Sequence, residues 1–474
     1  MLTTVDELSS RRKTIILITC CLSLLISSMD ATIVNVAIPA IRDDLGAPLS
    51  RLQWIVDVYT LTLASLLMLS GAAADRFGRK RVFRIGLLTF ALGSLLCSVA
   101  PTIEVLIGAR FVQAVGGSML NPVAMSIITT TFTGRIERAR AVGVWGAVVG
   151  ISTALGPMVG GVLIDSLGWQ SVFWINLPIV AVALALTTAY VPESKSARPR
   201  GMDPIGQALA IAVLFTLVYG LIEREPAVFV VSALALAGFV WHEARHPSPF
   251  IDLRFFRSFP FSSATVIAVC SFAGLGAFLF DMSLYLQGTR HFSAVHTGLL
   301  YLPMALGMLF FSPLSGRLVG RYGTRPSLLA SGILMSVAAI GLTLLHPDTP
   351  IWQLVITFAL FGIGFGMVNA PITTTAVSGM PLDRAGAAAA VASTSRQVGV
   401  SLGVALCGAL TGAGLWWTIA GFAAAVTALG VAANTDWAYR SRDRVAPPAR
   451  TEGPRSCRMT RPRPTRSGGS SPTW

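Results

Sequence analysis

The stretch LSGAAADRFGRKR at residues 69–81 recurs as LSGRLVGRYGTRP at residues 314–326, at an offset of 245. A second stretch, ERARA at residues 137–141, recurs as DRAGA at residues 383–387, at an offset of 246. Two matches at nearly one offset indicate an internal repeat, in which each half of the chain carries the same loops in the same order.

The composition shows what kind of protein surrounds this repeat. Of 474 residues, 53% are hydrophobic and only 12% are charged, and the mean hydropathy is +0.69. A soluble domain has about twice that charged share, because its surface must carry polar groups. A soluble enzyme, a disulfide scaffold and a disordered chain are therefore excluded. We predict an all-α polytopic membrane protein, since an open sheet would leave backbone groups unpaired in lipid.

Fourteen apolar segments are long enough to be candidate spans. They lie near residues 14–38, 52–70, 82–100, 105–130, 141–164, 171–191, 205–222, 227–241, 261–287, 297–316, 328–346, 351–377, 385–411 and 413–434.

Basic residues alternate between the loops that join these segments. If the N-terminus is cytoplasmic, the outer loops hold only Arg42, Arg51, Arg224 and Arg290, and the apolar segments hold Arg110 and Arg396. That leaves 30 of the 36 basic residues on the inner side. The positive-inside rule then predicts an even number of spans, with both termini cytoplasmic and the plasma (inner) membrane as the location. The net charge of +14 is explained by the basic residues that set this orientation. We therefore expect no nucleic-acid partner.

The repeated loop follows the second span of each half, so fourteen spans divide as six, two and six. Two similar halves in the same orientation are typical of a transporter. We predict a six-helix bundle at 1–191, linkers with two extra spans at 192–258, a second six-helix bundle at 259–437 and a disordered basic cytoplasmic tail at 438–474.

Two ionisable residues in the first half lie within spans. Asp30 belongs to MDATIVNVAIP at residues 29–39, and Arg110 to RFVQAVGG at residues 110–117, with Gln113 one turn further on. A buried charge in a span should face a cavity or a partner. Asp30 either exchanges a proton between states or is a neutral group hydrogen-bonded within the bundle. Arg110 is expected to pair with a carboxylate or a polar cluster.

Other polar groups in spans are weaker candidates for binding cargo or protons. Asp57, near the outer end of the second span, either binds a cation, shares a proton with Asp30 or sits at the aqueous mouth of the cavity. The remaining candidates, each with a structural role as the alternative, are Asn121, Asp281, Asn369 and Arg396.

The loop at residues 71–81 has the composition of a gate. Gly71 and Gly78 permit a close approach and a tight turn, and Asp75 can lie at a helix N-terminus. Arg76 and Arg79 can pair with carboxylates across the inner face. We predict contacts that form in the outward-facing state and break when the inner side opens; the alternative is charge that only sets topology.

The fifth span reads GAVVGISTALGPMVGG at residues 146–161. Its glycines, which include Gly150, Gly156, Gly160 and Gly161, predict a bare helix face for close packing. Pro157 frees a backbone carbonyl and predicts a bend in the helix.

These motifs together resemble the major facilitator superfamily, specifically its fourteen-span drug:proton antiporters of the EmrB/QacA type. The resemblance is dense over the first six spans and looser in the second half. It implies that Asp30 is a proton or substrate site and that the fifth-span motif marks an exporter. Ala114 and Gln170 depart from the family pattern, which usually has Gly and Arg there.

No phosphate-binding GxxxxGK[ST] motif, metal-ligand cluster or nucleophile–base set is evident. We therefore expect no enzyme activity and no cofactor, and a monomer driven by the proton gradient that exports an amphipathic drug or antibiotic by alternating access. The alternatives are a dedicated exporter of one endogenous metabolite or antibiotic, and a membrane sensor that does not transport.

Overall fold

The computed structural model describes residues 9–196, 203–246, 249–378, 380, 385–410 and 412–441, and this part of the chain contains helices and no strands. Of the disordered tail predicted at 438–474, residues 438–441 are helical, contrary to the prediction, and residues from 442 onward lie outside the described residues. Residues 383–384 of the second repeat match also lie outside them. Each of the fourteen apolar segments coincides with one helix or with two helices separated by a short break.

The elements form three consecutive groups. The first comprises α1 (Ser10–Leu45), α2 (Leu49–Phe77), α3 (Arg79–Ser98), α4 (Ile103–Thr131), α5 (Arg135–Leu167), α6 (Ser171–Trp174) and α7 (Asn176–Tyr190). The second comprises α8 (Pro204–Ile222), α9 (Pro226–Arg245) and the short turn η2 (Leu253–Arg257). The third comprises α10 (Phe259–Leu284), η3 (Tyr285–Thr289), α11 (Ala294–Leu300), α12 (Leu302–Tyr322), α13 (Arg325–Leu342), α14 (Ile351–Gly366), α15 (Asn369–Ser378), α16 (Ala385–Ala409), α17 (Ala413–Ala432) and α18 (Asp436–Arg440).

Within the described residues, 12 helices are long and apolar enough to cross a membrane, and the bent helix α5 makes 13. The helix α16 is not among them, although it has 25 residues and packs along α10 and α2. The chain is therefore an integral membrane protein with at least 12 candidate spans.

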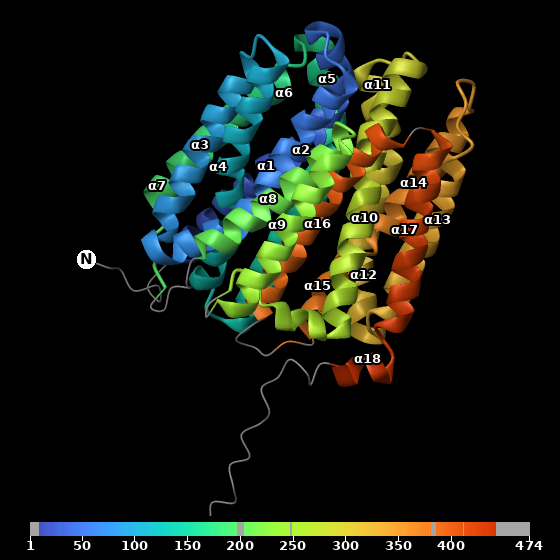
Figure 1. Ribbon diagram of the computed structural model, residues 1–474. Helices are drawn as coiled ribbons and strands as arrows, with labels where there is room; N and C mark the ends of the chain where they lie inside the picture. The colour runs from blue at the N-terminus through green and yellow to red at the C-terminus, as the bar shows by residue number, and fades with distance from the viewer. Residues whose placement is uncertain are drawn as a thin grey trace, which may run out of the picture.

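The internal repeat is visible in how the helices pair. In the first group α1 packs on α5, α2 on α4, and α3 on α7; in the third group α10 packs on α16, α12 on α14, and α13 on α17. These pairs occupy equivalent places along the two halves. Figure 1 shows the two groups side by side, the first in blue to green and the third in yellow-green to red. We refer to α1–α7 as the first half and to α10–α17 as the second half.

The two intervening helices attach to the seam between the halves. The helices α8 and α9 pack on each other, and α8 also contacts α2 of the first half and α16 of the second. In Figure 1 they cross the front of the molecule in green.

Both described ends of the chain lie at one face of the bundle, which we call the terminal face. Arg12 Nε, in the first turns of α1, donates to the Tyr190 carbonyl at the end of α7 (3.0 Å). The backbone N–H of Phe259, where α10 begins, donates to Ser441 Oγ (2.9 Å). The turns between α1 and α2 and between α3 and α4 lie at the other face, which we call the opposite face. The first of these turns is made by Gly46, whose φ of +62° favours glycine.

The halves are joined mainly near the opposite face. Gln53 Nε2 of α2 donates to the Val404 carbonyl of α16 (2.5 Å), and Gln287 Nε2 donates to the Val36 carbonyl of α1 (2.9 Å). Asp165, near the end of α5, accepts the backbone N–H groups of Ala294 and Val295 at the start of α11. These contacts close the seam between the halves at that face.

The helix α5 also contributes to this closure. It bends by 40° between Ile136–Thr153 and Leu155–Leu167, close to Pro157, whose ring removes a helical hydrogen bond. Added side-chain carbons at Gly156 and Gly160 would collide with Thr32 and Ile33 of α1.

One residue further on, a carbon at Gly161 would collide with the Ala294 backbone of the second half. The glycines at 156–161 therefore let α5 pack on both halves, whereas Gly146 and Gly150 face open space.

Candidate functional site

A cleft of about 600 Å³ separates the halves at the terminal face. Its walls are residues of α2, α4, α8 and α16 and the segment 249–250. The lining residues are Leu67, Met68, Leu69, Gly71, Ala72, Asp75, Pro122, Met125, Ser126, Thr129, Asp203, Gln207, Pro249, Phe250, Ala387 and Ala390. The only charged side chains in this described lining are the carboxylates of Asp75, which is paired with Arg79, and Asp203, which is bonded to His242. The rest of the lining is mainly apolar.

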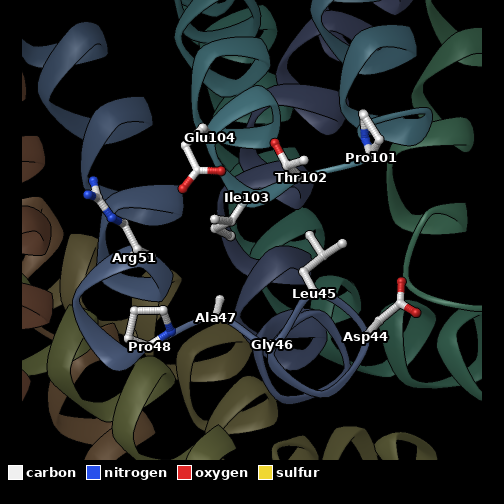
Figure 2. A pocket seen from close by; sticks show the side chains of 10 residues that line it. All are labelled: Asp44, Leu45, Gly46, Ala47, Pro48, Arg51, Pro101, Thr102, Ile103 and Glu104. Carbon is white, nitrogen blue, oxygen red and sulfur yellow. The ribbon is translucent and has the colours of Figure 1, made fainter.

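A second pocket of about 470 Å³ lies at the opposite face, within the first half alone. It is framed by the turn between α1 and α2 and by the start of α4. Figure 2 shows Arg51 and Glu104 toward one end of this pocket and Asp44 toward the other. Because both walls belong to one half, this pocket is not part of the seam through which the halves could separate.

The carboxylate that pairs with Arg110 is that of Asp30. Arg110 Nη1 lies 2.6 Å from Asp30 Oδ2 and 2.5 Å from Gln113 Oε1. Gln113 Nε2 donates to Asp30 Oδ1 (2.8 Å), so the three side chains close a ring of hydrogen bonds. All three are fully buried. The arrangement supplies both the carboxylate and the polar cluster that the sequence analysis expects beside Arg110.

Further groups complete this network from neighbouring helices. Asn176 Nδ2 at the start of α7 also donates to Asp30 Oδ1 (3.1 Å), and Ser94 Oγ of α3 accepts from Gln113 Nε2 (2.8 Å). Arg110 Nε donates to the Ile55 carbonyl (3.2 Å), and its guanidinium lies 4.0 Å from the centre of the Tyr59 ring. The Asp30–Arg110 network is therefore held by helices of the first half only and is sealed from the cleft.

The close approach of α3 and α4 explains how Ser94 reaches Gln113. Added side-chain carbons at Gly93 and Gly116 would collide with the backbones of Gln113 and Phe90 respectively. Ser94 and Asn176 were not predicted from the sequence. Asn176 carried a signal, because it is the only amide in the apolar run from residue 171 to residue 190.

Asp57 lies apart from this network, at the seam between the halves. It is fully buried in α2, and neither carboxylate oxygen has a hydrogen-bond partner. The hydroxyl of Ser401 in α16 lies near the Asp57 carboxyl. The two groups do not form a hydrogen bond with acceptable geometry. None of the ion pairs among the described residues includes Asp57.

The position of Asp57 along α2 relates it to the cleft. Gln53 donates a hydrogen bond to α16, and the Ala64 carbonyl accepts one from Thr394 of α16. Residues 68, 71, 72 and 75 line the cleft. Positions 53, 57, 64, 68, 71 and 75 are spaced by three, four or seven residues, so they share one face of α2. Asp57 therefore lies on the cleft-facing stripe of α2, beyond the point where the cleft ends.

Asp281 lies in α10 of the second half, near Trp416 and Tyr301. Cys407 of α16 is close enough to be influenced by both Asp281 and Asp57. The two acids therefore approach the same segment of α16 from different halves.

The other polar candidates are scattered. Arg396 donates to Thr373 Oγ1 (2.6 Å) and lies 5.9 Å from the Phe272 ring centre. Asn121 Oδ1 accepts from Ser27 Oγ (3.1 Å). Asn369 begins α15, where its carbonyl accepts from Thr373.

The predicted gate loop is held within the first half. Arg79 Nη2 lies 2.9 Å from Asp75 Oδ1, one turn away. Glu193, which follows α7, accepts the backbone N–H groups of Lys80 (3.1 Å) and Arg81 (3.2 Å) and so caps α3. Gly78 adopts a φ of +111°, which a side chain would strain. Arg76 forms none of the described ion pairs and lies against Phe77. None of the described ion pairs of this loop reaches the second half.

One cluster at the rim of the cleft was not foreseen. Asp203, His242 and His246 bring their polar atoms within 4.8 Å of one another. Burial disfavours the charged form of Asp203, but hydrogen bonds from Gly206 N–H and His242 outweigh it, so the pKa of Asp203 is lowered. The prediction of no metal-ligand set from the sequence missed this cluster. The four-residue spacing of His242 and His246 was a signal for it, whereas Asp203 could not be assigned to the pair because it lies 39 residues before His242.

Comparison with known proteins agrees with this architecture. A family model described as Major Facilitator Superfamily matches residues 20–404. The chain is 35% identical over 419 residues to the multidrug resistance protein Stp of Mycobacterium tuberculosis (strain CDC 1551 / Oshkosh). The matched region covers 86% of this chain and 78% of Stp. It is 34% identical to the tetracenomycin C resistance and export protein of Streptomyces glaucescens, over 81% of this chain and 73% of that protein.

A solved structure shares the fold. The chain superimposes on the crystal structure of a peptide transporter in complex with sulfate with a TM-score of 0.66, at 15% identity, over 90% of this chain and 94% of that one.

Proposed function

Because the chain belongs to the Major Facilitator Superfamily, whose members are transporters, we propose that it is a drug:proton antiporter that exports an amphipathic small molecule by alternating access. The observation that carries the proposal is a cleft between the halves that is open at the terminal face and closed at the opposite face, with an unpaired acid beyond its closed end. The resistance and export proteins among its relatives support the direction of transport.

The orientation follows from the loop charges. With the terminal face in the cytoplasm, the positive-inside rule is met, and the structure is in an inward-facing conformation. Counting α16 as a span, together with the 13 that include bent α5, gives the fourteen-span organisation: bundles at 1–191 and 259–437, and an insert at 192–258.

We assign proton exchange to Asp57 in preference to Asp30. Asp30 is neutralised by Arg110 and accepts three hydrogen bonds, so gaining a proton would break a satisfied network. Asp57 has no such partner, and an ionised carboxylate without one is costly in this setting. A protonated Asp57 suits the inward-facing state, and release of that proton would accompany binding of cargo.

The cleft lining indicates the chemistry of the cargo. Met68, Met125 and Phe250 offer adaptable apolar surface, and the charged side chains among the described lining residues are the acids Asp75 and Asp203. A cationic amphipathic molecule fits both features. No nucleotide-binding motif is present in the sequence, and a potential of 100 mV supplies about 2.3 kcal/mol per charge, so the proton gradient is the proposed energy source.

Gating uses the loop at 71–81. In the inward-facing state Arg79 is held by Asp75 within its own half. When the terminal face closes, Arg76 and Arg79 become available to acids across the seam.

The test uses ethidium, a cationic amphipathic dye, in an efflux-deficient bacterial host. Expression should accelerate loss of preloaded ethidium, and a protonophore should abolish that acceleration. Unchanged dye retention, or efflux that persists with the protonophore, would contradict the proposal.

A second candidate is export of one endogenous antibiotic. It is favoured by a relative that is a resistance and export protein for a single named compound, tetracenomycin C. A susceptibility panel separates the two: a multidrug exporter protects against several unrelated compounds, and a dedicated exporter against one.

A further inference from the structure

The helices α8 and α9 bring a carboxylate and two imidazoles together at the terminal face. We propose that Asp203, His242 and His246 bind a divalent transition-metal ion of the zinc class, which clasps the ends of these two helices. His242 Nε2 lies 3.0 Å from both carboxylate oxygens of Asp203, and His246 Nδ1 lies 3.5 Å from Asp203 Oδ2. Zinc binding at this site can be measured whether or not the chain transports the proposed cargo.

The spacing of the three donors is close to that of a metal site. Zinc bonds of about 2.0–2.1 Å in tetrahedral geometry place neighbouring ligand atoms about 3.3 Å apart. The two Asp–His distances bracket this value, and all three donor atoms lie within 4.8 Å. His246 follows the last turn of α9 as its C-cap, so its ring can approach without unwinding the helix.

The local charge favours a cation. Glu243 is 3% exposed, and its Oε1 is buried without a hydrogen-bond partner. Added carbon at Gly206 would collide with both Glu243 Oε1 and Asp203 Oδ2, so the two carboxylates border the same small space. No Lys or Arg forms an ion pair with either acid among the described residues. A divalent ion between the imidazoles and Asp203 would neutralise this buried pair.

The donor set indicates which ions fit. Two imidazole nitrogens and one carboxylate oxygen suit zinc and its neighbours nickel, cobalt and copper, whereas calcium and magnesium prefer oxygen ligands. Asp203 is 2% exposed and already oriented as the N-cap of α8, accepting from Gly206 N–H at 2.8 Å. A ligand held by its own helix end loses little freedom on binding.

The sequence HEARH at 242–246 has the His-Glu-x-x-His spacing of zinc metalloproteases. In those enzymes the Glu is a general base beside the metal-bound water. Here Glu243 Oε2 accepts the backbone N–H of Ile251 (3.0 Å), so this carboxylate holds the segment after α9. The geometry points to a structural clasp and not to a hydrolase.

The clasp would act on the extra helices as a unit. Asp203 stands at the start of α8, His242 and His246 at the end of α9, and Asp203, Gln207, Pro249 and Phe250 all line the cleft. Metal binding would therefore fix the α8–α9 hairpin at the edge of the cleft, where it contacts both halves.

The test is zinc binding by the purified full chain without a polyhistidine tag. After removal of metal with a chelator, Zn²⁺ is titrated against a chromogenic competitor. We expect one zinc per chain, and affinity at least about tenfold weaker in His242→Gln/His246→Gln. The matched control, His291→Gln/His296→Gln at the opposite face, should bind as the parent does. Cys457→Ser, which removes the thiol of the C-terminal segment, should also bind zinc with the affinity of the parent chain.

Two results would overturn the proposal: no zinc bound at one equivalent, or equal affinity in parent and His242→Gln/His246→Gln. If the double variant fails to fold, Co²⁺ added to the parent chain decides the question. Intense visible bands of a four-coordinate nitrogen/oxygen site support the clasp, and their absence contradicts it.

Discussion

Asp30 and Arg110 form a 2.6 Å ion pair in which neither side chain reaches solvent. The pair joins α1 to α4, and the amides of Gln113 and Asn176 occupy Asp30 Oδ1. A buried pair of this kind stabilises little relative to apolar residues, but removal of one partner leaves an uncompensated buried charge. The pair is thus better suited to holding the first half together than to meeting cargo.

Removing one charge of this pair should cost more stability than removing both. We expect Asp30→Asn to lower the free energy of unfolding by about 3–5 kcal/mol, because Arg110 remains buried without a counter-ion. The double variant Asp30→Asn/Arg110→Gln should recover part of that loss. Thermal unfolding in detergent measures both, and a double variant less stable than the single one would contradict the interpretation of the pair.

The glycines of α5 should differ sharply in their tolerance of a side chain. Gly161→Val places carbon against the Ala294 backbone, so we expect a destabilisation of about 1–3 kcal/mol and loss of drug resistance. Gly150→Val, in the same motif, enters open space and is the matched control. Resistance assays and membrane-fraction immunoblots distinguish the two, and equal behaviour of both variants would refute the role of the seam.

Glu193 should matter more than another acid at the terminal face. Glu193→Gln weakens the hydrogen bonds that the Glu193 carboxylate accepts from the two N–H groups at the start of α3. Glu193→Ala removes these hydrogen bonds and should lower the free energy of unfolding by about 1 kcal/mol. Glu137→Ala removes an exposed 3.3 Å contact with Lys13, and such surface pairs contribute about 0–1 kcal/mol. Limited proteolysis between α2 and α3 should increase for Glu193→Ala only. Increased cleavage in Glu137→Ala alone would reverse the assignment.

Acidic groups at the cleft should select cationic cargo. Asp75 and Asp203 are its only charged lining residues among those described, so Gln207→Lys should reduce efflux of ethidium more than efflux of a neutral drug. Gln207→Met, of similar size, controls for the loss of the amide. Equal reduction for both cargoes in Gln207→Lys would show that charge does not decide selection.

Much of the fold could be predicted from the sequence, because lipid forces the apolar segments into helices. The loop repeat at 69–81 and 314–326 predicted two similar halves, and the helices of the two halves pair in equivalent ways. The position of Arg110 within an apolar segment predicted that it has a polar partner. Which acid would meet it could not be predicted, since Asp30, Asp57 and Asp281 are all single acids in spans. That choice depends on helix rotation, which places Asp30 toward α4 and Asp57 toward α16.

The unpredicted parts depend on contacts between distant segments. Glu193 meets α3 across 112 residues or more, and Asp203 meets His242 only because α8 and α9 form a hairpin. Neither contact leaves a periodic pattern in the chain. The gate prediction concerns another conformation: in the present one, Arg79 is paired with Asp75 in its own loop.

The most direct measurement follows ethidium in proteoliposomes under an imposed pH gradient, for the parent chain and Asp57→Asn. One pH unit is worth about 1.4 kcal/mol per proton, or about tenfold accumulation for each proton exchanged. We predict gradient-driven accumulation by the parent chain, and in Asp57→Asn only downhill equilibration that ignores the gradient. Gradient-driven accumulation that persists in Asp57→Asn, or is missing from the parent chain, would contradict the account.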